Sequence, residues 1–181
     1  MTATGDPFLR AVEARGLTLP GPLADFHSGA AARSFSGECS ITRGRGALIG
    51  LLLRLGGFPP AGEGVAIHLE LRTGSAGQTQ WRRNFGGHET VSSLRFDARR
   101  RAVVERFGPF RITMVPETED QGLDLAISRI AVLGLPLPRW IAPKSSTRES
   151  VYAAGRIRFD VSASLPFLGM LIRYQGWLVP E

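Results

Sequence analysis

The sequence has very few of the residues that build disulfide scaffolds and thiolate metal clusters. Its 181 residues include one cysteine, Cys39, which excludes an internal disulfide and a zinc site made of several cysteines. Lysine is equally scarce, because Lys144 is the only lysine among 22 basic residues. Arginine therefore carries nearly all of the positive charge. The low cysteine content fits a reducing, cytoplasmic location.

Long hydrophobic runs are also missing. The most apolar segment, residues 46–58, is interrupted by Arg54 and ends close to a Gly-Gly pair, well short of the ~20 residues that a membrane-spanning helix needs. The N-terminus lacks the apolar core of a secretory signal, and it carries Asp6 and Glu13 where a transit peptide avoids acids. We therefore expect no transmembrane segment and no export.

The formal net charge of +6 raises the question of nucleic-acid binding. The arginines are scattered along the chain, and the densest run, "DARRRAV", falls where we expect a hairpin turn. Nucleic-acid binding is therefore not expected, and anionic ligands or surfaces, or plain solubility, account better for the charge.

The overall composition is that of an ordinary globular protein. Hydrophobic residues make up 43% of the chain and charged residues 21%. A chain of this length fits one domain and buries roughly 70% of its unfolded surface without covalent staples. We treat residues 1–181 as a single domain.

The N-terminal third predicts helix, strand and helix. Residues 7–15 form a short helix, because Asp6 is placed to cap it and apolar residues follow at helical spacing. The segment "LPGPLADFHSG" then breaks regularity, and a strand begins at Phe35. A second helix is expected over residues 46–58, above one end of the structure or at a membrane interface.

After Gly64 the sequence alternates between apolar and polar residues for most of its length. This period of two is typical of strands with one buried face, and glycine or charged residues separate the strands at hairpin-like spacing. About ten strands result, with one long irregular insert at residues 135–146. Because the connections are short, neighbouring strands pair antiparallel. An open sheet of this size would leave unpaired edges, so we expect a mainly β fold in which an antiparallel meander forms a strongly curved sheet or a closed barrel.

The segment "WRRNFGGHET", residues 81–90, concentrates aromatic and charged side chains. Its Gly-Gly pair favours a tight turn with positive φ, after which His88 begins the return strand. Trp81, Arg83 and Phe85 then share one face. We interpret the segment as a hairpin, and the open question is whether Arg83 points into the barrel.

Recognisable catalytic and metal-binding motifs are missing. The three histidines, His27, His68 and His88, are not at metal-ligand spacing, so we expect no metal and no cofactor. Cys39 has no identifiable base, and no serine lies in a nucleophile elbow. The spaced glycines of "GRGALIG" do not follow a buried strand in the manner of a dinucleotide site. The acids of "PETEDQGLD" read as a solvated hairpin tip, although they are candidates for acid-base chemistry.

The barrel interior is the remaining place for a ligand. An arginine that reaches a carboxylate or phosphate with two hydrogen bonds is the natural anchor there. Alternation places Arg158 opposite Phe159 and Arg173 opposite Tyr174, but a one-residue shift in register exchanges the two faces. The alternative is ordinary Arg-Asp pairing on the outer wall. The candidate ligand-binding residues are Trp81, Arg83, Phe85, His88, Trp140, Arg158, Arg173 and Tyr174.

An ordered set of short motifs resembles a bacterial family, the domain of unknown function 4166. The matching motifs are "ITRGRG", "GFPPAGEGV", "WRRNFGG", "ERFGPF", "VLGLPLPRWIAP", "GRIRFDV" and "LPFLGMLIRYQGWL". The resemblance covers roughly Phe8 to Pro180. Members of that family often stand alone, and in other architectures they follow an NADP-binding domain like that of saccharopine dehydrogenase, which this chain lacks. The resemblance therefore implies a module that binds or presents a substrate, and an NADP-dependent oxidoreductase as a partner.

Together these patterns favour non-catalytic binding of a hydrophobic or amphipathic small molecule, including an anionic one, inside the barrel. One alternative is an enzyme, or an accessory subunit of an oxidoreductase, that acts on a lipid-like substrate with His88 or the acids of "PETED" as its acid-base group. The other is an interaction module that uses a basic surface.

Overall fold

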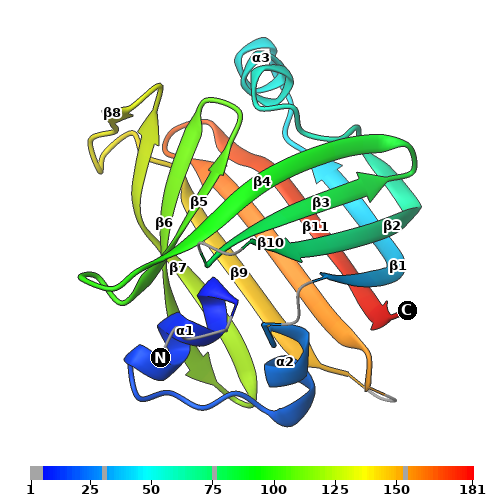
Figure 1. The fold of residues 1–181 in the computed structure, drawn as a ribbon. Coiled ribbons are helices and arrows are strands. Elements are labelled where there is room, and N and C mark those ends of the chain that lie inside the picture. The colour runs from blue at the N-terminus through cyan, green and yellow to red at the C-terminus, as the bar shows by residue number, and fades with distance from the viewer. Residues whose placement is uncertain (1–5, 30–31, 75–76, 153–154) are drawn as a thin grey trace.

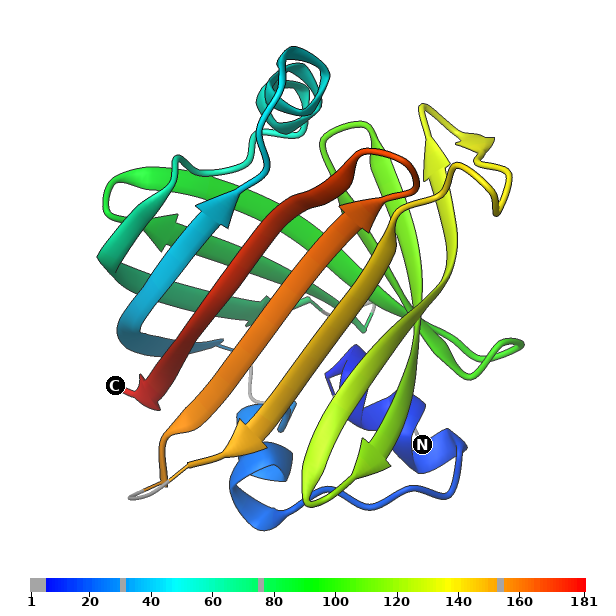
Figure 2. The same cartoon turned by 180° about the vertical axis from the view of Figure 1, so that it is seen from behind.

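The fold is a closed antiparallel β-barrel of ten strands (Figures 1 and 2). It is described by a computed structural model for residues 6–29, 32–74, 77–152 and 155–181. Strands β1 to β7 and β9 to β11 pair in chain order, and β11 returns to pair with β1. Among the described strands, β8 pairs with the end of β7 alone. The predicted mainly β barrel is confirmed.

The helices are α1 (Pro7–Ala14), α2 (Gly21–Phe26) and α3 (Ala47–Leu55), and the strands are β1 (Ala32–Arg43), β2 (Gly62–Thr73), β3 (Gln78–Phe85), β4 (His88–Asp97), β5 (Ala102–Phe107), β6 (Phe110–Glu119), β7 (Gly122–Val132), β8 (Leu135–Pro136), β9 (Lys144–Val151), β10 (Ile157–Leu165) and β11 (Gly169–Pro180).

Helices α1 and α2 close one end of the barrel (Figure 1). The carboxylate of Asp6 accepts a hydrogen bond of 2.8 Å from the backbone N–H of Phe8, so the predicted cap of α1 is present. The irregular segment expected after α1 in fact contains the short helix α2, which begins after Pro20 and buries Leu23 and Phe26. Both helices turn their apolar side chains into the barrel core. We call residues 6–29 the plug, and this the plugged end.

Helix α3 lies at the opposite end, which we call the α3 end (Figure 2). In an antiparallel ring every second connection lies at the same end. The α3 end therefore holds residues 44–61, which include α3, and the connections at residues 86–87, 108–109, 133–143 and 166–168. No helix among the described residues is long and apolar enough to cross a bilayer.

Candidate functional site

Side-chain alternation and strand register define which residues face the barrel interior. In β3, Trp81 and Phe85 are buried, and Arg83 lies between them on the same face. Arg82 lies on the other face and is exposed. The hairpin at Gly86 and Gly87 has the predicted positive φ values, 57° and 100°. Arg83 therefore points into the barrel, which answers the question that the sequence left open.

Arg83 is held inside the barrel by two neighbouring strands. Its Nη1 donates to the hydroxyl of Ser92 on β4 at 3.0 Å, and its Nη2 donates to Oε1 of Glu105 on β5 at 3.3 Å. Its guanidinium carbon lies 4.8 Å from the centre of the Trp81 ring, a cation–π distance. A guanidinium has five N–H donors, so within the described chain most of its hydrogen-bonding capacity is unused. The side chains of Arg83 and Glu105 stay 24% and 13% exposed, so the group is accessible.

Tyr174 on β11 lies near the Arg83 group. Its ring stacks on Phe85 with 5.5 Å between the ring centres. Burial raises the pKa of Tyr174 far above its usual range, although Arg83 and Arg43 oppose the change. The phenol is therefore neutral and can donate a hydrogen bond at physiological pH.

The apolar wall of the interior is unevenly covered. On β2 the inward residues Ile67, Leu69 and Leu71 are buried, whereas Val65 on the same face is only partly buried. On β10 the inward residues Val161 and Ala163 are only partly buried. The same holds for the inward residues Ile127 and Val151 on β7 and β9. These side chains keep part of their apolar surface accessible, although Leu123, Leu125, Ile157 and Phe159 on the same strands are buried.

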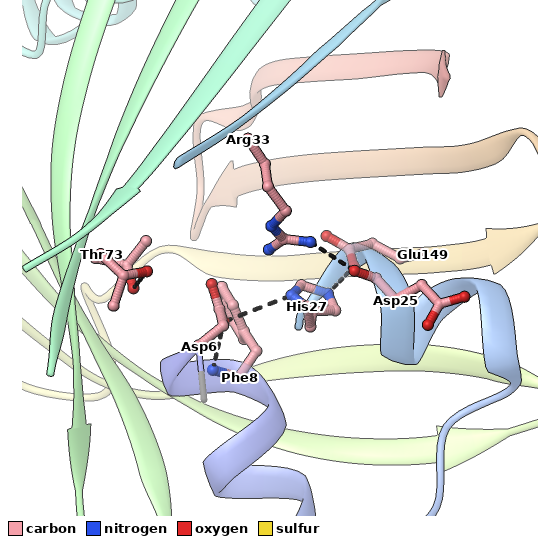
Figure 3. A network of polar contacts seen from close by, with 8 residues as sticks. Asp6, Phe8, Asp25, His27, Arg33, Thr73 and Glu149 are labelled. Carbon is pink, nitrogen blue, oxygen red and sulfur yellow. Dashed lines mark hydrogen bonds and ion pairs between the residues drawn. The ribbon is translucent and has the colours of Figure 1, made fainter. Parts of the chain in front are cut away.

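A second polar group lies where the plug meets the barrel wall (Figure 3). His27, at the end of α2, is fully buried, and its Nε2 lies 2.7 Å from Oε2 of Glu149 on β9. Its Nδ1 lies 3.6 Å from Oδ1 of Asp6, which is also fully buried. The rings of Phe8 and Phe26 pack against His27 at 5.1 and 4.8 Å. These contacts join both plug helices to the strand wall. We call Asp6, His27 and Glu149 the plug triad.

The surroundings of the plug triad are not saturated with hydrogen bonds. Four buried side-chain atoms among the described residues have no hydrogen-bond partner, and they are Asp6 Oδ2, His27 Nδ1, Arg33 Nε and Trp81 Nε1. His27 stacks on Trp81 with 6.3 Å between ring centres, so the plug triad continues through Trp81 to Arg83. An unmade hydrogen bond at a buried atom costs about 1–3 kcal/mol. Because these hydrogen bonds are missing, the stability of this region depends more heavily on the ion pairs of His27 with Glu149 and Asp6.

His27 is protonated at neutral pH. Complete burial lowers its pKa, but the nearby Glu149 and Asp6 carboxylates outweigh burial and raise the pKa from 6.5 to about 9. The three groups of the triad are not arranged to hold a metal ion, and no group of three or more His, Cys, Asp and Glu in the described chain is. Full burial under Phe8 and Phe26 keeps a substrate from touching the imidazole. We interpret the triad as a clamp on the plug.

This clamp predicts a pH dependence of stability. The folded protein holds the His27 proton up to about pH 9, whereas the unfolded chain releases it near 6.5. The stabilisation is complete below pH 6.5 and is lost as the pH rises through 9. We expect the free energy of unfolding, measured by urea denaturation, to fall between pH 6.5 and 9.

Two other groups set the limits of that measurement. Burial raises the pKa of Cys39 to about 11, so the thiol lowers the free energy of unfolding only above about pH 9, where it ionises in the unfolded chain. Burial also raises the pKa of Tyr174, which lowers the free energy of unfolding only at still higher pH. A His27→Gln variant should lose the slope between pH 6.5 and 9. An unchanged slope in that variant would assign it to another group.

Three of the predicted ligand contacts lie away from the interior. Arg173 is exposed on the outer face of β11 and forms a bidentate pair with Asp160, at 3.0 and 2.6 Å, which holds the pKa of Asp160 below its usual range. Arg158 is exposed on the same outer face of β10. Trp140 is 70% exposed in the connection between β8 and β9. The outer-wall alternative therefore describes Arg158 and Arg173, and we leave these three residues out of the site.

The remaining predicted contacts split between the interior and the rim. Trp81, Arg83, Phe85 and Tyr174 come together in the barrel through the contacts described above. His88 begins β4 at the α3 end, and its Nε2 contacts the backbone oxygen of Gly57 at 2.9 Å. His88 thus ties the β3–β4 turn to the segment after α3, and it is apart from the Arg83 group.

The acids of "PETEDQGLD" lie at the β6–β7 hairpin, as predicted. Glu117, Glu119 and Asp120 are exposed. They border two shallow, open hollows of about 300 and 400 Å³ on the outside of the plugged end. A catalytic carboxyl group lies in a pocket that shields it from water, and these acids lie on open surface. These acids therefore do not support the acid-base alternative.

Sequence reasoning missed Glu105, Ser92 and the plug triad. Glu105 and Glu149 each occupy an inward position of a strand: Glu105 lies between Val103 and Phe107, and Glu149 lies between Thr147 and Val151. That alternation was visible in "VVERF" and "TRESV", and an acid at an inward position signals a buried partner. The partner of Glu149 could not be read in the same way, because His27 lies 122 residues away in a segment without periodicity.

Comparisons with known proteins place the chain in a family but give no activity. A search of the curated proteins finds no match. Among solved structures, the dehydratase domain of RzxB from Pseudomonas fluorescens aligns with 10% identity over 93% of this chain and 80% of that chain, at a TM-score of 0.20, too low to carry an argument. The family described as "Domain of unknown function (DUF4166)" matches residues 19–178, most of the barrel. The chain therefore belongs to this DUF4166 family.

Proposed function

We propose that the protein binds an amphipathic, anionic small molecule inside the barrel, with Arg83 as the anchor for its acidic head group. The observation that carries this proposal is the position of Arg83, which projects from β3 into the interior between Trp81 and Phe85. An arginine on an inward face loses solvation energy that is not offset unless its charge is paired with an acidic group. Glu105 offsets that charge through one long contact of 3.3 Å and leaves donors for a second acid.

The neighbourhood of Arg83 suits a carboxylate or a phosphate. Ser92 contacts the guanidinium, and the neutral phenol of Tyr174, whose ring stacks on Phe85, is a further donor in the interior. A bound acid would meet one full positive charge, two hydroxyls and the face of Trp81, with Glu105 as the only opposing charge among the described contacts of Arg83. An anionic group gains from such a site through charge-assisted hydrogen bonds.

In this proposal the apolar part of the ligand packs against the β7–β10 side. Ile127, Val151, Val161 and Ala163 are inward and partly accessible. Barrels of similar strand number enclose one small ligand with a few polar groups that fix its head. The predicted oxidoreductase partner and the cytoplasmic location are tested by none of these contacts and stay predictions.

Replacing Arg83 by methionine tests this function directly. Methionine keeps an unbranched side chain but removes every donor, so we expect the Kd for oleate or hexadecyl phosphate to rise about 10- to 100-fold, as for loss of a charge-assisted hydrogen bond. Isothermal titration calorimetry with the purified protein measures the change. Hexadecanol, which has no charge, should bind both proteins about equally.

Arg82→Met is the matched control, because Arg82 is the preceding residue on the exposed face of the same strand. It should leave the affinity unchanged. The double variant Arg83→Met/Glu105→Gln also removes the charge left on Glu105, so it should bind oleate less weakly than Arg83→Met but still more weakly than the unaltered protein. Equal losses in Arg82→Met and Arg83→Met, or no binding of any of these molecules to the unaltered protein, would refute the proposal.

A further inference from the structure

The α3 end of the barrel exposes most of the large apolar side chains that face solvent. Nine of the eleven exposed large hydrophobic residues in the described chain lie there, and the other two are Val91 and Tyr152. The nine are Leu48, Leu51, Leu55, Leu133, Leu135, Trp140, Phe167, Leu168 and Met170. Exposed apolar residues gathered at one end of a protein mark an interaction surface. We call these nine residues the apolar rim.

Helix α3 contributes one stripe of the apolar rim. Leu48, Leu51 and Leu55 are spaced three and four residues apart, so they share one helix face, and each is more than half exposed. The opposite face buries Ile49 and Leu53. Because α3 is apolar on both faces, the barrel buries one face and leaves the other apolar face in contact with solvent.

Two further connections carry the rest of the apolar rim. Phe167, in the β10–β11 turn, is 95% exposed and has a positive φ of 67°. Leu133, which also has a positive φ, and Trp140 lie in the connection between β7 and β9. Figures 1 and 2 show α3, the β10–β11 turn and the β8 region standing at the same end of the barrel. The apolar rim is thus made of separate projections and not of one flat patch.

The connections at this end carry only positive charge. Residues 44–61, 86–87, 108–109, 133–143 and 166–168 contain no Asp or Glu. They carry Arg45, Arg54 and Arg139, and the adjoining strand ends add Lys144 and two exposed acids, Glu63 and Glu89. The four cations are exposed, and none forms an ion pair with another described residue. The plugged end differs, because its plug and turns include Asp6, Asp25 and Asp120.

We propose that the apolar rim docks the protein on an anionic lipid bilayer. Apolar side chains on projecting elements, with unpaired arginines beside them, are the features by which proteins bind the interface of an acidic membrane. Trp140 suits the headgroup level, where one side of its ring is apolar and the other is hydrated. A second copy of the chain fits less well, because the excess of cations at this end would face the same excess on the other copy.

Vesicle flotation with the full chain tests this surface. We expect binding to vesicles of phosphatidylcholine with about a third phosphatidylglycerol, and much weaker binding to pure phosphatidylcholine or at high salt. Leu51→Asp and Phe167→Asp should each lower the partition coefficient tenfold or more, since each removes a side chain that the bilayer would bury. Both residues are exposed, at 53% and 95%, so neither change disturbs the core.

The matched control for the apolar change is Tyr152→Asp. Tyr152 is 57% exposed at the plugged end, so its replacement should leave vesicle binding unchanged. For the charges, Arg54→Gln and Arg139→Gln should each lower binding about fivefold, the equivalent of about 1 kcal/mol per cation near the surface. Arg99→Gln and Arg101→Gln, which are exposed in the β4–β5 turn, remove the same charge at the other end and should have little effect.

A position-specific readout completes the test. Lipids brominated near the headgroup should quench the fluorescence of Trp140, so a Trp140→Phe variant should lose most of the quenching. Three results would overturn the proposal: no binding to acidic vesicles, equal effects at the two ends, or a dimer in solution that Phe167→Asp abolishes. The last result would assign the apolar rim to a second copy. None of these outcomes depends on Arg83, so the vesicle experiments test this inference independently of the proposed ligand.

Discussion

Replacing Glu149 by leucine is expected to lower the free energy of unfolding by about 3–5 kcal/mol, the cost of removing one partner from a buried ion pair. Glu149 lies 2.7 Å from His27 Nε2, and both side chains are buried where the plug meets β9. Water cannot replace the lost carboxylate there, so the imidazole either keeps an uncompensated charge or gives up its proton. Urea denaturation at pH 7 measures the change.

Asp124→Asn is the matched control for this prediction. Asp124 pairs with Arg148 at 2.7 Å, one residue away from Glu149 in the same β7–β9 ladder, but on the partly exposed outer face. Exposed pairs of this kind contribute roughly 0–1 kcal/mol. If the two variants lost the same stability, the burial of the plug triad would have no special energetic weight.

A second measurement separates electrostatics from packing. Burial lowers the pKa of His27 and the carboxylates raise it, so Glu149→Leu should bring the His27 pKa well below 9. Glu149→Gln keeps the volume and should lower the pKa in the same direction. Titration of the imidazole by NMR gives both values, and an unchanged pKa in the two variants would contradict the clamp.

Gly37→Ala is expected to destabilise the barrel by about 3 kcal/mol or more, as an insertion into a packed region that cannot yield easily. Gly37 lies on β1 opposite Leu178 of β11. A Cβ at residue 37 would overlap the backbone oxygen of Trp177 and lie 3.2 Å from the Cα of Leu178. Because the obstacle is backbone, relief requires the two strands to separate. Calorimetric unfolding should show a large fall in Tm.

Gly50→Ala provides the contrasting substitution. Gly50 lies in α3, and an added Cβ there meets nothing within 4 Å. Alanine is favoured over glycine inside a helix by roughly 0.5–1 kcal/mol, so this variant should be slightly stabilised. A loss at Gly50 comparable to that at Gly37 would show that the close approach of β1 and β11 is not the cause.

The sequence predicts the barrel well because its strands are encoded locally. Alternation in "VAIHLELR" and the Gly-Gly turn after Phe85 depend only on neighbouring residues, and the structure confirms both. Short connections then leave antiparallel pairing as the only arrangement, and about ten strands favour closure. The side of β3 that carries Trp81, Arg83 and Phe85 was also correctly grouped.

The candidate site was less predictable because it depends on what meets in space. Alternation groups Arg158 with Asp160 and Arg83 with Trp81, but it does not say which group faces inward until the whole ring is closed. The plug triad joins segments that are far apart in the sequence. Helix α2 has only six residues, too few for its apolar spacing to predict a helix. The apolar rim likewise exists only because alternate connections gather at one end.

The pairing of β1 with β11 has a consequence for how the protein folds. Every other strand in the ring pairs with a near neighbour in sequence, whereas this pairing joins Phe35 to Pro180 and Arg43 to Ile172. The local hairpins can form early, but β1 keeps an unpaired edge until the last strand has been added. Closing so long a loop is entropically slow, and an open edge strand invites pairing with other chains in the meantime. We therefore expect the closure of the ring to limit the folding rate, and strand exchange between molecules to be the characteristic misfolding event.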